Sequence, residues 1–121
     1  LEIELARTWH KVFALHLEYA VEGIETLDAD PARIRDDCAC SLGRWMAEWR
    51  PRLSAMPAFR LLDERHRAFH LIAGDLAAQH LAGLLCCERQ GELDCELARL
   101  RAASADVFAS LEALGQELAN A

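Results

Sequence analysis

Two histidines, His66 and His70, are the residues of this 121-residue chain whose spacing most directly suggests chemistry. They are four positions apart, so on a helix their side chains share one face, with Cβ atoms about 6 Å apart, and both can reach one metal ion. This spacing alone also arises on helix surfaces. Here Leu62 and Ala73 continue the same face, which predicts that the imidazoles are buried. Because a buried polar group without a partner costs about 1 to 3 kcal/mol, the histidine pair needs a partner inside the fold.

A third histidine and a cysteine extend this candidate site. His16 is in register with Trp9 and Ala20 on an apolar stripe, so its imidazole is also expected inside the fold. A single core histidine is more often hydrogen-bonded to a carbonyl or a hydroxyl than bound to a metal. Three inward histidines are much harder to satisfy in that way. Cys40 then supplies a fourth ligand.

Gly43 stands three positions after Cys40, in the middle of a predicted helix. Glycine costs about 1 kcal/mol there relative to alanine, so its presence calls for a reason. We expect the missing side chain to let a neighbouring helix, or the histidines on it, approach the thiolate. Trp45 and Trp49 would form an apolar wall that limits water around the site.

Three imidazoles and one thiolate form a tetrahedral N₃S set, which suits Zn²⁺. A site whose four positions are all filled by protein is structural or regulatory, because catalysis needs an open position. The sequence contains no HExxH motif, no phosphate-binding Gly-rich loop and no Ser/His/Asp arrangement that we can recognise. We therefore expect a zinc-binding domain without catalytic activity of its own.

Helical periodicity dominates the chain and predicts an all-α protein. Four helices are expected: over residues 3–27, from about 36 or 37 to the residue before Pro51, from Pro57 to about 89, and over 93–118, after the Gln90-Gly91 pair. Asp30, followed by Pro31, is suited to cap a short turn between the first two. Three long helices and one shorter one predict an antiparallel four-helix bundle, a fold that builds metal sites from inward-facing side chains.

Each long helix carries a stripe of residues that we expect to face the core. The first stripe consists of Leu5, Trp9, Val12, His16, Ala20 and Leu27, broadened by Phe13, Leu17 and Ile24. The third helix contributes Phe59, Leu62, His66, Phe69, His70, Ala73, Ala77, His80 and Leu84. The fourth contributes Leu93, Leu97, Leu100, Ser104, Val107, Leu111, Leu114 and Leu118.

Composition narrows the class of protein further. With 20 acidic and 13 basic side chains the net charge is −7, and no basic stripe is available for nucleic acid. The sequence has neither a membrane-spanning apolar stretch nor a signal-peptide pattern, and its five cysteines are not spaced as a disulfide framework. These features favour one cytoplasmic domain over residues 1–121. The start at Leu1, with helix by residue 3, suggests a domain excised from a larger protein.

The order of these motifs resembles the chemoreceptor zinc-binding (CZB) domain family. His16-Leu-Glu-Tyr19 is followed by Cys40-x-Leu-Gly43-x-Trp and then by His66-x-x-x-His70. The motifs of the resemblance run from His16 to His70. Over the whole chain, the number of expected helices agrees with the family. One departure is Ala20 after Tyr19, where many relatives have lysine; it leaves the ligands unaffected.

The resemblance implies a four-helix bundle with a zinc site of three histidines and one cysteine, on His16, Cys40, His66 and His70. It also implies a homodimer appended to a bacterial cytoplasmic signalling protein, such as a chemoreceptor or a diguanylate cyclase. In such relatives zinc occupancy modulates the attached output domain, and the zinc-bound cysteine responds to hypochlorous acid. Cys40 would then be the redox-sensing thiolate.

Two other classes of protein stay open at this point: a metal-free helical dimerisation module, and an iron-binding bundle of the hemerythrin type, which would need bridging carboxylates. Several residues receive no functional role. Cys86, Cys87 and Cys95 are interpreted as packing residues, and Cys38 as a possible partner for an oxidised Cys40. His10 has no assigned role, and His80 is too far along its helix from His70 to bind the same ion.

Overall fold

The computed structural model describes residues 2–24, 26–27, 30–83 and 90–120. Within these ranges the chain forms five helices: α1 (Ile3–Val21), α2 (Pro31–Arg35), α3 (Ser41–Leu53), α4 (Pro57–Leu81) and α5 (Gln90–Ala119). The described residues contain no strand, so the all-α prediction is confirmed.

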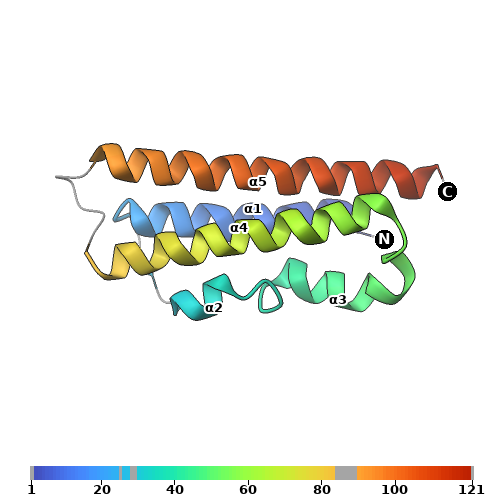
Figure 1. Cartoon of the computed structure of the whole chain (residues 1–121), viewed down its shortest axis with the longest axis horizontal. Coiled ribbons are helices and arrows are strands. Elements are labelled where there is room, and N and C mark those ends of the chain that lie inside the picture. Colours follow the sequence, from blue (N-terminus) through green and yellow to red (C-terminus); the bar gives the residue numbers. More distant parts are fainter. Residues whose placement is uncertain (1, 25, 28–29, 84–89, 121) are drawn as a thin grey trace.

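The helices form an antiparallel four-helix bundle. Three of its helices are long, and the two short helices α2 and α3 together take the place of the fourth. Figure 1 shows α1, α4 and α5 as three long helices side by side, with α2 and α3 end to end on the side away from α5. The short α2 packs against α4, and α3 packs against α1. A bidentate pair between Arg50 and Asp63, with both N–O distances 3.1 Å, also joins α3 to α4. The four-helix architecture is therefore as predicted, and the short turn expected after Asp30 forms an additional helix, α2.

The first helix ends six residues earlier than predicted, at Val21 rather than at residue 27. Gly23 follows with a φ of 83°, a left-handed conformation that glycine adopts without steric cost. The Gly23 amide donates to the Ala20 carbonyl, and the Ile24 amide to the Tyr19 carbonyl. This pair of bonds is a Schellman motif, which closes the C-terminus of a helix.

The bounds of α3 also differ from the prediction. Asp36 accepts a hydrogen bond from the Cys38 amide at 2.9 Å, and this side-chain turn keeps the chain out of helical conformation until Ser41. The helix then continues through Pro51 to Leu53, so the expected end before the proline is wrong. Pro51 is exposed and lies in the last turn, where a lost amide donor disturbs little of the helix.

The connection from α4 to α5 begins earlier than predicted. Helix α4 ends at Leu81 and not near residue 89, and Gly83 has a φ of 72°. The expected stripe residue Leu84 and the two cysteines Cys86 and Cys87 lie outside the described residues. Gln90 begins α5 instead of ending the preceding helix.

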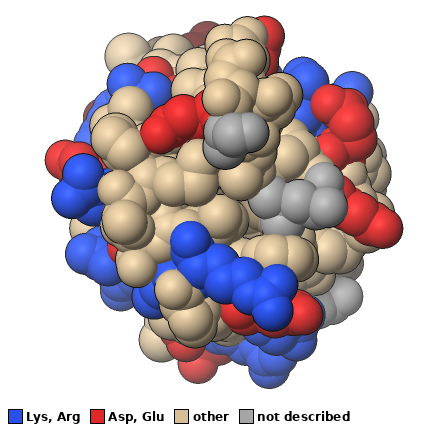
Figure 2. Space-filling view, turned by 90° about the vertical axis from the view of Figure 1, so that its right-hand side faces the viewer, with Lys and Arg blue, Asp and Glu red and all other residues tan. Residues whose placement is uncertain are grey.

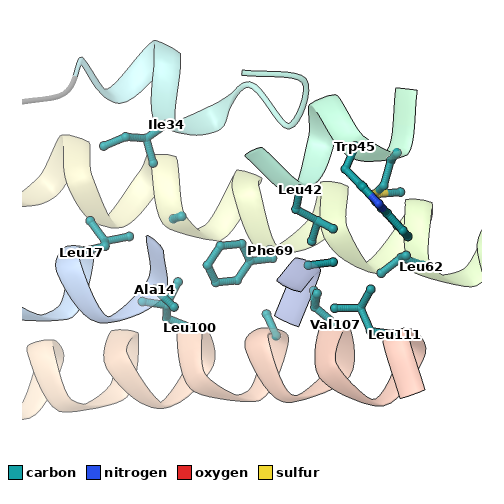
Figure 3. Packing of buried hydrophobic residues seen from close by; sticks show 14 of the residues in the cluster. Ala14, Leu17, Ile34, Leu42, Trp45, Leu62, Phe69, Leu100, Val107 and Leu111 are labelled. Carbon is teal, nitrogen blue, oxygen red and sulfur yellow. The ribbon is translucent and has the colours of Figure 1, made fainter. Parts of the chain in front are cut away.

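The core confirms the stripes predicted for the last two helices. Phe69 of α4 lies at the centre, between α4, α1 and α5 (Figure 3), and is fully buried. Along α5 every predicted stripe residue from Leu93 to Leu114 is buried, and Leu118 packs at the edge. The 30-residue α5 thus presents one continuous face to the other helices.

The stripe predicted for α1 is correct only in part: Leu17 and Ala20 are buried, but the buried face is rotated away from Leu5, Val12 and His16. The buried residues are Ala6, His10, Ala14, Leu17, Ala20 and Val21. Leu5, Val12 and Tyr19 are instead 41%, 47% and 41% exposed, and Ile24 is 67% exposed. The small inward alanines let α1 approach its neighbours, while an apolar strip remains outside. We call the strip made of Leu5, Trp9, Val12, His16 and Tyr19 the α1 seam.

Charged side chains of both signs are interspersed over the end of the bundle seen in Figure 2, which gives no continuous basic surface there. This agrees with the acidic composition and does not favour nucleic acid as a partner. None of the described helices is long and apolar enough to cross a membrane.

Candidate metal centre

Cys40 is placed by the start of α3. It is the N-cap residue of that helix, and its Sγ accepts a hydrogen bond from the Gly43 amide at 3.2 Å. The same sulfur lies 3.6 Å from the Asp37 carbonyl oxygen, to which a thiol can donate. A helix N-terminus favours negative charge, so this position suits a cysteine that must become a thiolate.

Gly43 makes room for the chain that leads to Cys40. A Cβ at this position would lie 1.8 Å from the Asp37 carbonyl oxygen and 3.1 Å from the Cys38 Cα. We expected Gly43 to make room for a neighbouring helix. The group that needs this space is instead the preceding turn of the same chain, folded back over the first residues of α3.

His66 and His70 lie on successive turns of α4 and are each 1% exposed, as predicted. Their Nε2 atoms are 3.0 Å apart. The Cys40 Sγ is 3.3 Å from the Nε2 atom of His66. All three ligand atoms lie within 4.8 Å of one another, so α3 and α4 bring the predicted cysteine and histidine pair together.

The orientation of His70 is fixed by a backbone group of α2. Its Nδ1 is 2.6 Å from the Ile34 carbonyl oxygen, and since a carbonyl only accepts, Nδ1 must carry the proton. In the neutral ring this leaves the lone pair on Nε2, which faces His66 and Cys40. Metal-binding histidines commonly donate their other ring N–H to a carbonyl in this way.

Burial keeps both imidazoles in the form that binds metals. It lowers the pKa of His66 to about 3, with a further contribution from His70. The pKa of His70 is also lowered by burial, against the opposing effect of its bond to the Ile34 carbonyl. Burial raises the pKa of the Cys40 thiol, although the Gly43 amide opposes this. Near neutral pH, two neutral imidazoles face a thiol whose proton a metal must displace.

The donor set and its spacing fit zinc. Bonds of about 2.0 Å to nitrogen and 2.3 Å to sulfur put the ligand atoms of a tetrahedral site roughly 3.3 to 3.6 Å apart. The separations of 3.0 Å and 3.3 Å need only small adjustments to reach this. The group contains no carboxylate that could bridge two irons, so the hemerythrin-type alternative gains no support from it.

His16 does not join the other three predicted ligands in this structure. Its side chain is exposed, so the prediction that it is buried is wrong. The cause is the rotated face of α1, which turns His16 toward a groove that Phe13 and Ile34 also line. Phe13 in turn contacts the ring of His70 at a centroid distance of 5.1 Å. The role of His16 as a ligand stays a prediction.

Sequence reasoning missed a buried polar pair between α1 and α5. His10 is 2% exposed, and its Nε2 is 2.9 Å from the Ser104 Oγ. The signal was the presence of Ser104 in the apolar stripe of α5, which called for a polar partner from another helix. Burial lowers the pKa of His10 to about 4, with a smaller contribution from His70.

The remaining polar candidates lie outside the centre. His80, a residue of the predicted core-facing stripe, is only partly buried near the end of α4. Cys38 and Cys95 are free and exposed, so the interpretation of Cys95 as a packing residue is wrong. Asp36, Asp37 and Cys38 also lie close together, but none of the three is buried.

A helical bundle that brings two neutral imidazoles and a thiol within reach of one cation defines a zinc-binding domain. Comparison with known families agrees: residues 10–77, more than half of the chain, match the chemoreceptor zinc-binding domain, and the chain belongs to this family. The matched range contains Cys40, His66 and His70, and it also contains His16. No curated protein and no solved structure gives a significant match to the chain.

Proposed function

We propose that this chain is the zinc-sensing domain of a bacterial cytoplasmic signalling protein, either a chemoreceptor or a diguanylate cyclase. Zinc binds at Cys40, His66 and His70, with His16 as the fourth ligand, and the domain catalyses no reaction. The observation that carries the proposal is the convergence of one thiol and two buried imidazoles, from two different helices, on one point. Zinc occupancy there modulates an attached output domain.

The position of the centre supports a regulatory role. Cys40 is the N-cap residue of α3 and both histidines stand on α4, so one ion would tie the start of α3 to α4, in addition to the Arg50–Asp63 pair. Loading and unloading the ion therefore changes how firmly α3 is held. A change in helix packing is a signal that a neighbouring domain can receive.

His16 is proposed as the fourth ligand because it lines the groove beside the centre. It stands three positions, nearly one helical turn, after Phe13, whose ring contacts His70. A closed tetrahedral site needs a fourth donor, and a third imidazole would complete the N₃S set.

The test is the metal content of the purified domain, prepared without chelator, beside that of the Cys40→Ala variant. We expect about one zinc per parent chain and at least 100-fold weaker binding after removal of the thiolate, which supplies the only anionic ligand of the set. Elemental analysis gives the content, and competition with a chromophoric chelator gives the affinity.

Cys95→Ala is the matched control, because Cys95 is a free, exposed cysteine on α5 away from the centre. This variant should retain the zinc of the parent. A parent protein that takes up no zinc would contradict the proposal and leave the metal-free helical dimerisation module as the function.

We further propose that Cys40 senses oxidants. Burial raises the pKa of its thiol, so the reactive thiolate depends on bound zinc. Net attack of that thiolate on hypochlorous acid forms an S–O bond, breaks the O–Cl bond and releases chloride, which leaves a sulfenic acid and a weaker ligand. A loosened α3 would follow.

Mass spectrometry after a substoichiometric dose of hypochlorous acid tests this role. We expect zinc-loaded protein to be oxidised at Cys40 before Cys38 and Cys95, with zinc released in step. Zinc-free protein should lose this preference, because Cys40 is then a partly buried thiol whose pKa is raised by burial, while Cys38 and Cys95 are exposed. Oxidation of Cys38 or Cys95 first, with zinc still bound, would rule the oxidant role out.

A homodimer through the α1 seam is also part of the proposal. Leu5, Val12 and Tyr19 are seven positions apart and each more than 40% exposed, which is the heptad spacing of helices that pair along their length. Most homodimers pair one patch with itself about a two-fold axis, and a single apolar strip meets that requirement. Such a dimer would also enclose His16.

A further inference from the structure

Helix α2 has only five residues, from Pro31 to Arg35, and so cannot be stable by itself. Asp30 caps its first turn, accepting from the Ala32 amide at 2.9 Å, but one cap does not overcome the cost of forming so short a helix. Its conformation must come from docking on the bundle. The contacts that dock it therefore decide whether it forms.

The contacts that dock α2 are made with α4. Ile34 is 4% exposed and points from α2 toward α4 (Figure 3). Arg35 forms an ion pair with Asp75 at 2.6 Å. The Ile34 carbonyl accepts the Nδ1 proton of His70, as described above. One short segment thus shares its docking surface with a ligand of the metal centre.

Gly74 sets how closely the two helices approach. A Cβ added there would lie 2.7 Å from the Arg35 Cβ and 3.1 Å from the Arg35 Cα. The second of these atoms belongs to the backbone and cannot rotate away. Gly74 also lies one turn after His70 on the same helix, so any retreat of α2 moves the Ile34 carbonyl away from the imidazole.

We propose that Gly74 is a positioning residue of the metal centre: it lets α2 dock closely enough for the Ile34 carbonyl to hold His70 with Nε2 turned toward Cys40 and His66. The inference rests on the proposed zinc site and adds a partner to it. Because coupling between two equilibria is reciprocal, bound zinc also stabilises the docked α2. The zinc-sensitive part of the domain then includes α2, which contributes no ligand.

The first experiment compares the zinc affinity of the parent, the Gly74→Ala variant and the Gly115→Ala variant by chelator competition. Gly115 is the matched control because a Cβ there meets only Ile3, at an ordinary 3.8 Å. We expect Gly74→Ala to bind zinc about 10-fold to 100-fold more weakly, the usual effect of losing the hydrogen-bond partner of a ligand. Gly115→Ala should bind as the parent does. Equal affinities in all three proteins would overturn the proposal.

Asp75→Asn is a second, milder variant that keeps the proposal testable if Gly74→Ala does not fold. Asp75 is an exposed residue, so the fold should tolerate its neutralisation. Losing the exposed pair with Arg35 should weaken zinc binding by about twofold to fivefold. An unchanged zinc affinity in this variant counts against the role of α2.

Two further readouts separate positioning from general stability. Long-range ¹H–¹⁵N spectra of zinc-free protein should show His70 protonated at Nδ1 in the parent and a mixture of tautomers in Gly74→Ala. Hydrogen exchange at the amides of Arg33, Ile34 and Asp36, which are bonded within or beside α2, should slow when zinc binds to the parent. Zinc binding without slower exchange would refute the coupling. If the parent binds no zinc, the proposed function fails, and the tautomer comparison still decides whether α2 orients His70.

Discussion

Replacing Gly43 with alanine is expected to abolish tight zinc binding while leaving most of the helical content intact. The new Cβ would overlap the Asp37 carbonyl oxygen, at 1.8 Å, so the turn before α3 must move. That turn and the Gly43 amide are the two groups that place the Cys40 sulfur. A displacement of about 1 Å is enough to spoil a constellation held to about half an ångström, and we expect affinity to fall at least 100-fold.

Chelator competition measures the affinity of this variant, and far-ultraviolet circular dichroism measures its helix. Gly91→Ala is the control, since an added Cβ there meets nothing within 4 Å and the residue lies in the first turn of α5. It should bind zinc as the parent does. Parental zinc affinity in Gly43→Ala would show that the turn does not position Cys40.

A charge in the α1 seam is expected to convert the proposed homodimer into monomers. Val12 lies at the middle of the seam and is 47% exposed in the single chain. At a two-fold interface Val12→Glu would place two carboxylates in the apolar contact, one from each copy. Burying like charges there costs several kcal/mol, so dissociation should become at least 100-fold easier.

Sedimentation equilibrium or light scattering checks the mass, which for the parent should be twice the 13.5 kDa of one chain. Leu71→Glu is the matched control, because Leu71 is 49% exposed but belongs to α4. That variant should remain dimeric. A monomeric parent, or a dimer that both substitutions disrupt equally, would rule out the seam as the interface.

The sequence was most informative where residue type and helical spacing predicted the same buried face. His66 and His70 stand on an apolar stripe at helical spacing, and the structure buries both beside Cys40. The stripe of α5 was equally clear, because its leucines recur every three or four residues with polar residues between them. In both places only one face of the helix could be buried.

Helix α1 was harder to predict because it is apolar on more than one face. Val12 and Phe13 are adjacent, so helical periodicity alone could not say which of them turns inward. The structure places Phe13 against His70 and leaves Val12 outside, with alanines filling the closest contacts. The error at His16 followed from this one rotation of the helix. The early end of the same helix follows from Gly23, whose left-handed conformation the prediction did not anticipate.

Hydrogen bonds of backbone groups could not be predicted from the residue types, because every residue carries a carbonyl and almost every residue an amide. The group that orients His70 is the carbonyl of Ile34, which any residue at that position would supply. Likewise the Glu117 carboxylate accepts from the Ala58 amide at 3.0 Å and satisfies the start of α4 from α5. Such partners depend on how the helices pack, and they became visible only with the assembled bundle.

The three converging ligands differ in how firmly the scaffold holds them. His66 and His70 share one 25-residue helix and are buried, whereas Cys40 precedes the first turn of α3 and keeps part of its surface in solvent. A proton, a chelator or an oxidant that arrives from solvent meets the sulfur before either imidazole. If zinc is bound as proposed, we therefore expect the bond to Cys40 to break before the bonds to the two histidines of α4.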